Sequence, residues 1–390
     1  MGFKRSVLIG TGFIAALACE LVSGSLRGTF NAYNEALKQQ LSLDQQQVTL
    51  LGSVSFFGYF ALINGFIHDK VGPKFAMLLG MLFAVTGYAG VWLILKGEIT
   101  TSYPLLLAFF VFIGIGNGFG FFIFVSQVAN FPYQYRGSVI GSMSLMFALS
   151  GALFAPIYTQ TYGKSIQVIE NDVAGFMLLM AILHLITYFI CIAIVDIYSV
   201  DITGGNSVNE GLNPKSEKKK DATLLQELSR IDYWIIVLAP SSAIPCLVFI
   251  YTIGFVAVSF FGRDSTTSKR IIDIATVLFA VFGALGRLLG GVLNDLGNKL
   301  WPQTGSIWFL LCVNALNALT NIGLLFLMDK EWYLYIACIS VGLVFGIFGS
   351  LPQSMIASWY NIKHLGFLTG MGGFFLAMAF TAVQAASSAM

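Results

Sequence analysis

Charged residues are scarce in this chain of 390 residues, where Asp, Glu, Lys and Arg together make up 10%, against roughly 25% in an average soluble domain. Hydrophobic residues make up 57%, and the mean hydropathy is +0.80. A soluble core cannot bury that much apolar surface. The apolar residues come in runs of about 20, the length of a helix that crosses a bilayer. The sequence therefore predicts an integral membrane protein with the lipid bilayer as its solvent.

Histidine and cysteine are also rare, and motifs of the common enzyme classes are absent. The three histidines, His68, His184 and His364, form no His-Glu-x-x-His zinc motif, and the five cysteines lack the spacing of a metal site or a disulfide framework. Neither a Gly-x-Ser-x-Gly elbow nor a Walker loop occurs. With 21 basic and 19 acidic residues, the chain has no basic face for nucleic acid. We expect no enzyme activity, no metal or other cofactor and no nucleic-acid partner.

Eleven continuously apolar runs predict eleven transmembrane helices, six before and five after a polar stretch. Continuous runs indicate helices and not a β-barrel, whose strands alternate between polar and apolar residues. The runs lie near residues 7–37, 48–67, 74–95, 103–128, 138–158, 173–197, 233–260, 271–293, 304–328, 332–356 and 365–387. We therefore predict an all-α polytopic fold with two pseudo-symmetric helix bundles, residues 1–200 and 231–390, joined by a linker at 201–230.

The linker carries glycines and three consecutive lysines, Lys218–Lys220, which indicate a flexible, solvated segment. Lys and Arg are more frequent in the loops on the side of the N-terminus and the linker than on the other side. By the positive-inside rule, this predicts a cytoplasmic N-terminus and a cytoplasmic central loop. The membrane in which the protein resides cannot be read from the sequence.

Two sequence patterns occur once in each predicted bundle. Gly-x-x-x-Asp, followed shortly by Gly and Lys, begins at Gly65 after the second helix and at Gly291 after the eighth. A second pair follows helices four and ten, with Gly137 and Gly141 in the first copy and Gly366 and Gly370 in the second. Two matches in the same register predict a duplicated six-helix unit.

The first loop resembles the signature loop of the major facilitator superfamily, with Gly65, Asp69, Lys70, Gly72 and Lys74 in place. The resemblance implies two six-helix bundles and a cytoplasmic latch that stabilises the outward-facing state. A carboxylate there can accept hydrogen bonds from a helix N-terminus, and the glycines allow helices to approach closely. The predicted gating residues are these five together with Asp295 and Arg136.

A narrower set of motifs resembles the nodulin-like branch of that superfamily, which is related to the monocarboxylate porters. It includes Asn130-Phe131-Pro132, Arg136-Gly137, Leu149–Ala152, Tyr158, Tyr33-Asn34 and Lys363–Gly366. The resemblance implies a eukaryotic solute porter. Two departures stand out. The superfamily usually has twelve helices, and the monocarboxylate porters place an aspartate one turn before the arginine of helix eight, where this chain has Gly283 before Arg287.

Charged side chains inside the predicted helices mark candidate sites because each costs about 2.5–3.5 kcal/mol at the centre of a bilayer. Glu20 and Arg27 lie seven residues apart, two turns along one face of the first helix. Arg287 lies in the eighth helix and Asp273 near its outer end. Arg27 and Arg287 would together bind a carboxylate. Alternatively, Glu20 neutralises Arg27, and Arg287 bonds to carbonyl groups or reaches the interface.

Polar uncharged residues complete the predicted binding site, although helix packing explains buried amides equally well. They are Asn31, Tyr33, Asn117, Gln127, Asn314 and Asn317. Glu20 and Asp273 are the candidates for proton coupling. Pro240 and Pro245 predict a kink in the seventh helix, with or without a gating movement.

The sequence thus predicts a monomeric secondary transporter that moves a small solute by alternating access. The two arginines and the family resemblance favour an organic anion such as a monocarboxylate, with or without a co-transported proton. Neutral amino acids, sugars or metal chelates are alternative cargoes on the same fold. A membrane receptor or sensor that binds its ligand without moving it is the alternative outside transport.

Overall fold

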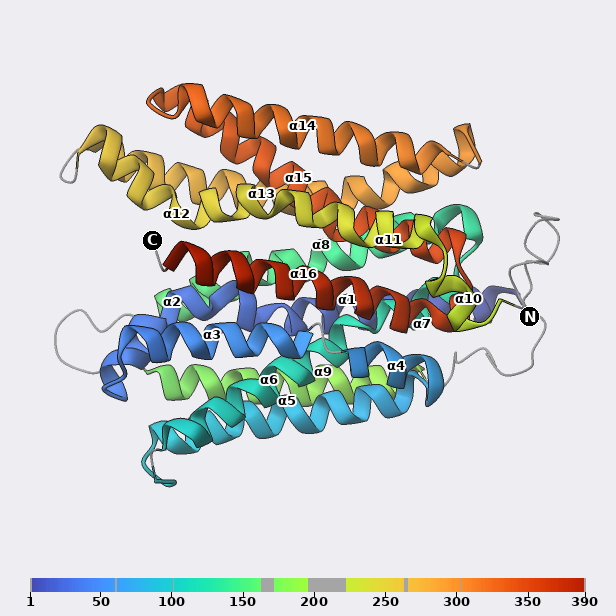
Figure 1. Cartoon of the computed structure of the whole chain (residues 1–390). Coiled ribbons are helices and arrows are strands. Elements are labelled where there is room, and N and C mark those ends of the chain that lie inside the picture. Colours follow the sequence, from blue (N-terminus) through green and yellow to red (C-terminus); the bar gives the residue numbers. More distant parts are fainter. Residues whose placement is uncertain are drawn as a thin grey trace. The chain divides into compact units, whose positions relative to one another are not determined.

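The computed structural model describes residues 2–59, 62–100, 102–162, 172–195, 222–262, 266–302 and 304–388. Every regular element within those ranges is a helix (Figure 1). Up to residue 195 the helices are α1 (Gly2–Ser23), α2 (Ser25–Gln40), α3 (Gln45–Tyr59), α4 (Leu62–Lys70), α5 (Pro73–Leu95), α6 (Tyr103–Phe121), α7 (Phe124–Asn130), η1 (Tyr133–Tyr135), α8 (Arg136–Ile157), η2 (Tyr158–Tyr162) and α9 (Val173–Val195).

From residue 222 onward the elements are α10 (Leu224–Leu228), α11 (Ile231–Leu238), η4 (Ala239–Ala243), α12 (Ile244–Phe261), α13 (Thr266–Leu300), α14 (Gly305–Leu327), α15 (Glu331–Trp359), η5 (Ile362–His364) and α16 (Leu365–Ser388). Each predicted apolar run corresponds to one helix or to consecutive helices, so the all-α polytopic prediction is confirmed.

Seven helical segments in the described ranges are long and apolar enough to cross a membrane on their own. They are Pro73–Leu95, Tyr103–Asn130, Tyr133–Tyr162, Val173–Ile194, Val277–Leu300, Gly305–Leu327 and Glu331–Trp359. Two shorter apolar segments, Ile9–Ser23 and Ile231–Ala243, end at interruptions of a longer predicted run. The chain is an integral membrane protein that crosses the bilayer several times.

Interruptions within the apolar runs were not predicted in detail, and each has a local cause. Between α1 and α2 lies Gly24, where a Cβ would sit 2.3 Å from the carbonyl oxygen of Phe147, so only glycine allows this approach. The π-helical turn η2 follows Pro156, which lies inside α8 and removes a backbone donor. The 3₁₀ turn η4 separates α11 from α12 beside Pro240 and Pro245.

The chain divides into two compact units whose boundaries cross its helices. The first comprises residues 1–130, 146–212 and 362–377, and the second comprises residues 131–145, 213–361 and 378–390. The fifteen residues 131–145, which include the start of α8, thus belong to the second unit, and the start of α16 belongs to the first. The linker predicted at 201–230 falls largely outside the described residues, so the predicted division there stays a prediction.

Each unit has an apolar core built from facing helices. In the first unit, Tyr33, Phe110 and Phe176 are buried in one cluster of α2, α6 and α9 side chains. In the second unit, buried residues of α12, α13 and α15 form another, with Ala275 and Val341 among them. Small residues bring the helices of each unit into close contact.

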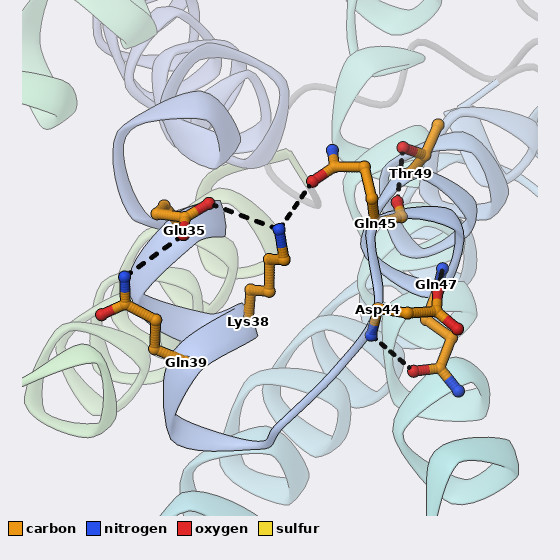
Figure 2. Close-up of polar contacts among 7 residues, drawn as sticks. All are labelled: Glu35, Lys38, Gln39, Asp44, Gln45, Gln47 and Thr49. Atoms are coloured by element: carbon orange, nitrogen blue, oxygen red, sulfur yellow. Dashed lines mark hydrogen bonds and ion pairs between the residues drawn. The ribbon is translucent and has the colours of Figure 1, made fainter.

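The turn between α2 and α3 is closed by polar side chains (Figure 2). Asp44 begins α3 as a reciprocal cap, since its carboxylate accepts from the Gln47 amide at 2.7 Å and its own N–H donates to the Gln47 side chain at 2.9 Å. Lys38 of α2 donates to Gln45 of α3 at 3.0 Å and lies 4.0 Å from Glu35. These contacts fix where α3 starts.

Candidate functional site

Asp69, the carboxylate of the first repeated loop, caps the start of α16. Its two oxygens accept hydrogen bonds from the backbone N–H groups of Gly366 at 2.9 Å and Phe367 at 2.7 Å. These N–H groups have no acceptor within their own helix, and the N-terminal end of a helix carries partial positive charge, so a carboxylate is a favourable partner. We call this arrangement the first cap.

Glycines allow the first cap to form. A Cβ at Gly65 would lie 2.0 Å from the carbonyl oxygen of Gly366, and a Cβ at Gly366 would lie 2.6 Å from the carbonyl oxygen of Gly65. The two backbones therefore touch, one turn from the Asp69 carboxylate. Gly72, at φ 105°, ends the loop in a conformation that favours glycine and leads into Pro73, the first residue of α5.

Asp295, the carboxylate of the second repeated pattern, caps the start of α8 in the same way, although it lies within α13, which extends past the predicted end at residue 293 to Leu300. It accepts from the backbone N–H groups of Gly137 at 2.8 Å and Ser138 at 2.6 Å, and also from the Ser138 hydroxyl at 2.6 Å. A Cβ at Gly291 would lie 2.1 Å from the carbonyl oxygen of Gly137. We call this arrangement the second cap.

The two repeated patterns are joined crosswise. The carboxylate of the first copy binds the helix start of the second copy, at Gly366, and the carboxylate of the second copy binds the helix start of the first, at Gly137. Each cap lies within one compact unit, because the helix starts are the segments whose assignment crosses the middle of the chain. The duplication therefore appears in the contacts as well as in the sequence.

The basic residues of the predicted gating set lie around the caps without bonding to the carboxylates in the contacts described. Lys70 and Lys74 are exposed at the end of α4 and the start of α5. Arg136, the first residue of α8, places its guanidinium carbon 5.7 Å from the centre of the Tyr133 ring. Backbone N–H groups are partners of both carboxylates.

Arg287 is buried in α13, with 7% of its surface exposed. Its guanidinium donates to the carbonyl oxygen of Ser144 in α8 at 3.3 Å, and it lies 5.9 Å from the centre of the Phe345 ring. Gly349 leaves space beside it, since a Cβ there would stand 3.5 Å from the guanidinium carbon. The structure thus places a cation among backbone, aromatic and glycine neighbours within a membrane span.

The other predicted charged residues are only partly described. Glu20 of α1 is buried, with 1% of its surface exposed. The side chains of Arg27, Asn31 and Asp273 lie outside the described residues. Pairing of Glu20 with Arg27, and anion binding by Arg27, therefore stay predictions.

Tyr33 and Gln127 are both buried, in different surroundings. The Tyr33 ring packs edge-on against Phe30 and Tyr158 with centroid distances of 5.6 and 5.8 Å, inside the core of the first unit. Gln127 of α7 is 2% exposed and donates to Ser126 at 3.4 Å. A cargo contact at either residue stays a prediction.

Asn117 belongs to a buried polar network that sequence reasoning missed. Nε2 of His184 lies 2.7 Å from the Asn117 side chain, and its Nδ1 lies 2.7 Å from the carbonyl oxygen of Met180. A neutral imidazole that donates from Nδ1 accepts at Nε2, which requires the amide nitrogen of Asn117 to face it. Nearby, Tyr188 bonds Ser23 at 2.8 Å and donates to the Gly116 carbonyl at 3.0 Å. The sequence feature that could have indicated this network is a histidine in the middle of an apolar run.

Asn314 and Asn317 of α14 face the interruption between α11 and α12. The Asn317 amide donates to the carbonyl oxygen of Ser242 at 2.7 Å, and the Ser242 hydroxyl donates to the Asn314 side chain at 2.7 Å. Substrate binding by these amides stays a prediction. Within the described part of the chain, no group of three or more His, Cys, Asp or Glu residues could hold a metal ion.

Comparisons with known proteins identify a family and a fold. A family model described as Nodulin-like matches residues 11–212, just over half of the chain. No curated protein matches the sequence significantly.

Among solved structures, the proton:xylose symporter XylE bound to 6-bromo-6-deoxy-D-glucose is similar at a TM-score of 0.64 and 12% identity, over 98% of this chain and 90% of that one. A bacterial homologue of the iron transporter ferroportin in its outward-facing state is similar at 0.65 and 16%, over 97% and 92%. A variant of the fucose:proton symporter FucP of E. coli is similar at 0.62 and 16%, over 96% and 91%. At these identities the likeness shows the fold alone.

Proposed function

The chain belongs to the Nodulin-like family and has the fold of major facilitator transporters, and on that premise we propose that it moves an organic anion such as a monocarboxylate across a membrane. Transport is by alternating access and is driven by an ion or solute gradient. The observation that carries the cargo class is the buried guanidinium of Arg287 in a membrane span.

The surroundings of Arg287 support an anion as its ligand. A guanidinium in a span is costly, and a carbonyl such as that of Ser144 offsets less of that cost than an anion would, because hydrogen bonds between two ionised groups are stronger. A carboxylate can accept two parallel N–H bonds from the guanidinium fork. The Phe345 ring and the backbone of Gly349 lie beside the guanidinium, so an anion there would meet no acidic side chain from these two residues.

The two caps support a gating role for Asp69 and Asp295. Each carboxylate holds the start of a transmembrane helix through N–H groups that would otherwise lack an acceptor, so opening a cap leaves both sides without partners. Such a contact has two discrete states, made and broken, which is what a gate needs. We assign both carboxylates to the conformational step of the cycle.

Glu20 is our candidate for coupling to a proton gradient. A carboxylate that is 1% exposed within α1 is neutral or ionised according to its partners, so it can take up and release a proton when those partners change. We place Asp273 second, on its sequence position alone. A coupled carrier would accumulate its cargo when the proton gradient points inward.

The experiment is uptake by proteoliposomes of labelled monocarboxylates, amino acids and sugars, with and without an inward proton gradient. We expect saturable uptake of a monocarboxylate, reduced at least tenfold by Arg287→Ala, since about 1.4 kcal/mol of lost binding is a factor of ten. The control is Arg270→Ala, which removes an exposed arginine of the same helix whose partner is Glu331. Surface ion pairs of this kind contribute little, so uptake should persist.

Three other outcomes would change the proposal. Uptake of a sugar or amino acid that Arg287→Ala leaves intact would keep the transporter and overturn the anion site. Saturable binding of a solute without uptake would favour a receptor. Equal losses in Arg287→Ala and Arg270→Ala would show that removing any arginine from α13 impairs the protein.

A further inference from the structure

The α11–η4–α12 segment is an apolar helix interrupted at its middle. The helix α11 ends at Leu238, five residues follow as the 3₁₀ turn η4, and α12 begins at Ile244. In a 3₁₀ turn each carbonyl accepts from the N–H three residues ahead, whereas in an α-helix it accepts from the N–H four residues ahead.

The 3₁₀ turn leaves the carbonyl of Ser242 without its 3₁₀ backbone donor. Its 3₁₀ partner would be residue 245, which is proline and has no N–H. A carbonyl at membrane depth needs a partner, because lipid offers none. The sequence therefore creates an unmet acceptor at this position.

Asn317 of the neighbouring helix α14 meets that need. Its side-chain nitrogen donates to the Ser242 carbonyl oxygen at 2.7 Å, and Asn317 is 4% exposed. One turn before it, Asn314 accepts from the Ser242 hydroxyl at 2.7 Å, whereas Thr320, one turn after it, bonds within α14 to the Leu316 carbonyl at 2.9 Å. Asn317 thus makes a bond between helices that its neighbour Thr320 does not make.

A continuous helix offers the same carbonyl a different partner. If η4 became α-helical, the Ser242 carbonyl would accept from the backbone N–H of Cys246, and the Asn317 amide would lose its acceptor. Going from 120° and 2.0 Å per residue to 100° and 1.5 Å over five residues turns α12 by about 100° relative to α11 and shortens the segment by about 2.5 Å. The two forms are therefore discrete and present different faces of the helix.

We propose that Asn317 is a positioning residue that holds the α11–η4–α12 segment in its interrupted form, and that exchange of the Ser242 carbonyl between Asn317 and the Cys246 N–H switches this helix during transport. The role in transport rests on the proposed function. The bond itself and its effect on the helix do not. Like other hydrogen bonds between membrane helices, it should shift the ratio of the two forms by roughly threefold to tenfold.

The switch is tested by pulsed electron–electron measurement of the distance between two spin labels, one on α11 and one on α12. Ile235→Cys and Phe260→Cys, exposed by 59% and 51% on α11 and α12, carry the labels in a background without native cysteines. We expect Asn317→Leu, which keeps the volume and removes the donor, to enrich a second distance population threefold to tenfold. Thr320→Val is the matched control and should leave the distribution of the parent protein unchanged.

Pro245→Ala provides a second, independent test of the switch. It restores an N–H at position 245, so the Ser242 carbonyl has a backbone donor in both forms, and Asn317→Leu should change the distribution less in this background than in the parent. An unchanged distribution in Asn317→Leu, or an equal effect in both backgrounds, would overturn the proposal. If the parent protein moves no solute while the distances behave as expected, the proposed function fails and the switch stands.

Discussion

The first and second caps both join a carboxylate to the start of a helix, but they differ in how closely their sequences follow the family signature. Asp69 follows the family signature closely and accepts from two backbone N–H groups. Asp295 lies near the end of α13, in a copy of the pattern that is one residue shorter and has Leu296 in place of a basic residue, and it accepts from two backbone N–H groups and the Ser138 hydroxyl. The copy with the poorer motif thus also forms a cap, with a side-chain hydroxyl among its donors.

This difference separates two parts of the signature. The glycine and the carboxylate are what the contacts use, because the backbones touch and the N–H groups need an acceptor. The basic residues around them are exposed in the first copy. The comparison therefore assigns a large part of the stability of each cap to the carboxylate and to the close approach of the two backbones.

The largest effect is expected from Gly65→Ala and Gly291→Ala, which test whether the backbones at the first and second caps are packed equally closely. Each methyl group would lie within 2.1 Å of a facing carbonyl oxygen, so the backbones must separate at a cost of about 1–3 kcal/mol or more. Both should lower the melting temperature of the purified protein by similar amounts. Gly283→Ala is the control in α13, because its methyl would meet only the Gly342 carbonyl, at 3.7 Å. An unchanged melting temperature for either variant would show that the two backbones at that cap can separate at little cost.

Next come Asp295→Asn and Asp69→Asn, which replace charged acceptors by neutral ones. Hydrogen bonds to charged groups are worth about 1.5–3 kcal/mol, and we expect the loss at Asp295 to be the larger. Cysteines placed at the exposed positions Gln134 and Lys363, close to the two helix starts, should be labelled faster by a thiol reagent in the corresponding variant. Uptake should fall in both.

Asp172→Asn is the matched control for these variants. Asp172 begins α9 by accepting from the Gly175 N–H at 2.7 Å through one oxygen, which the single oxygen of asparagine can replace. Asp69 and Asp295 accept backbone N–H groups through both of their oxygens, which asparagine cannot do. Labelling at Gln134 and Lys363 should not change. If Asp69→Asn were equally silent, the first cap would be no more than a local helix cap.

Ser138→Ala should have a smaller effect, because it gives the second cap the two donors of the first. We expect a loss of about 0.5–1.5 kcal/mol, typical of one hydrogen bond. In a double-mutant cycle, Ser138→Ala should cost less when Asp295 is already asparagine. Strict additivity of the two changes would contradict a bond between the two side chains.

The smallest effects are expected from Lys70→Leu and Leu296→Lys, which exchange the residues after the two carboxylates. Both positions are exposed, and surface changes usually stay within about 0.5 kcal/mol. Melting temperature and thiol labelling should therefore be close to those of the parent. A large decrease in the melting temperature of Lys70→Leu would show that the lysine contributes substantially to the stability of the first cap.

Hydrophobic runs were sufficient to predict the helices, because each span must satisfy its own backbone in lipid. The interruptions were less accessible. Pro240 and Pro245 indicated a kink, but the 3₁₀ turn at Ala239–Ala243 depends on Asn317, which is 75 residues from its acceptor. The break at Gly24 likewise depends on a carbonyl in α8. Tertiary partners decide such local conformations, and a single sequence does not show them.

The candidate site was predictable in its residues and not in its pairings. The repeated Gly-x-x-x-Asp pattern identified Asp69 and Asp295, since the chemistry of a carboxylate near a helix start is general. The crosswise exchange of partners was hidden because both helix starts carry similar glycines. The network around His184 was missed for another reason, since a histidine in an apolar run has no periodic signal that distinguishes a bonded core residue from a ligand.

The crosswise caps bear on how the chain is made. The two partners in the first cap are separated by 297 and 298 positions in the sequence, so Asp69 leaves the ribosome long before the residues that it binds. Contacts of such high sequence separation form late and slow folding. The first unit is therefore completed only when α16 has been synthesised, and an N-terminal half expressed alone should be degraded unless the other half is supplied in the same cell.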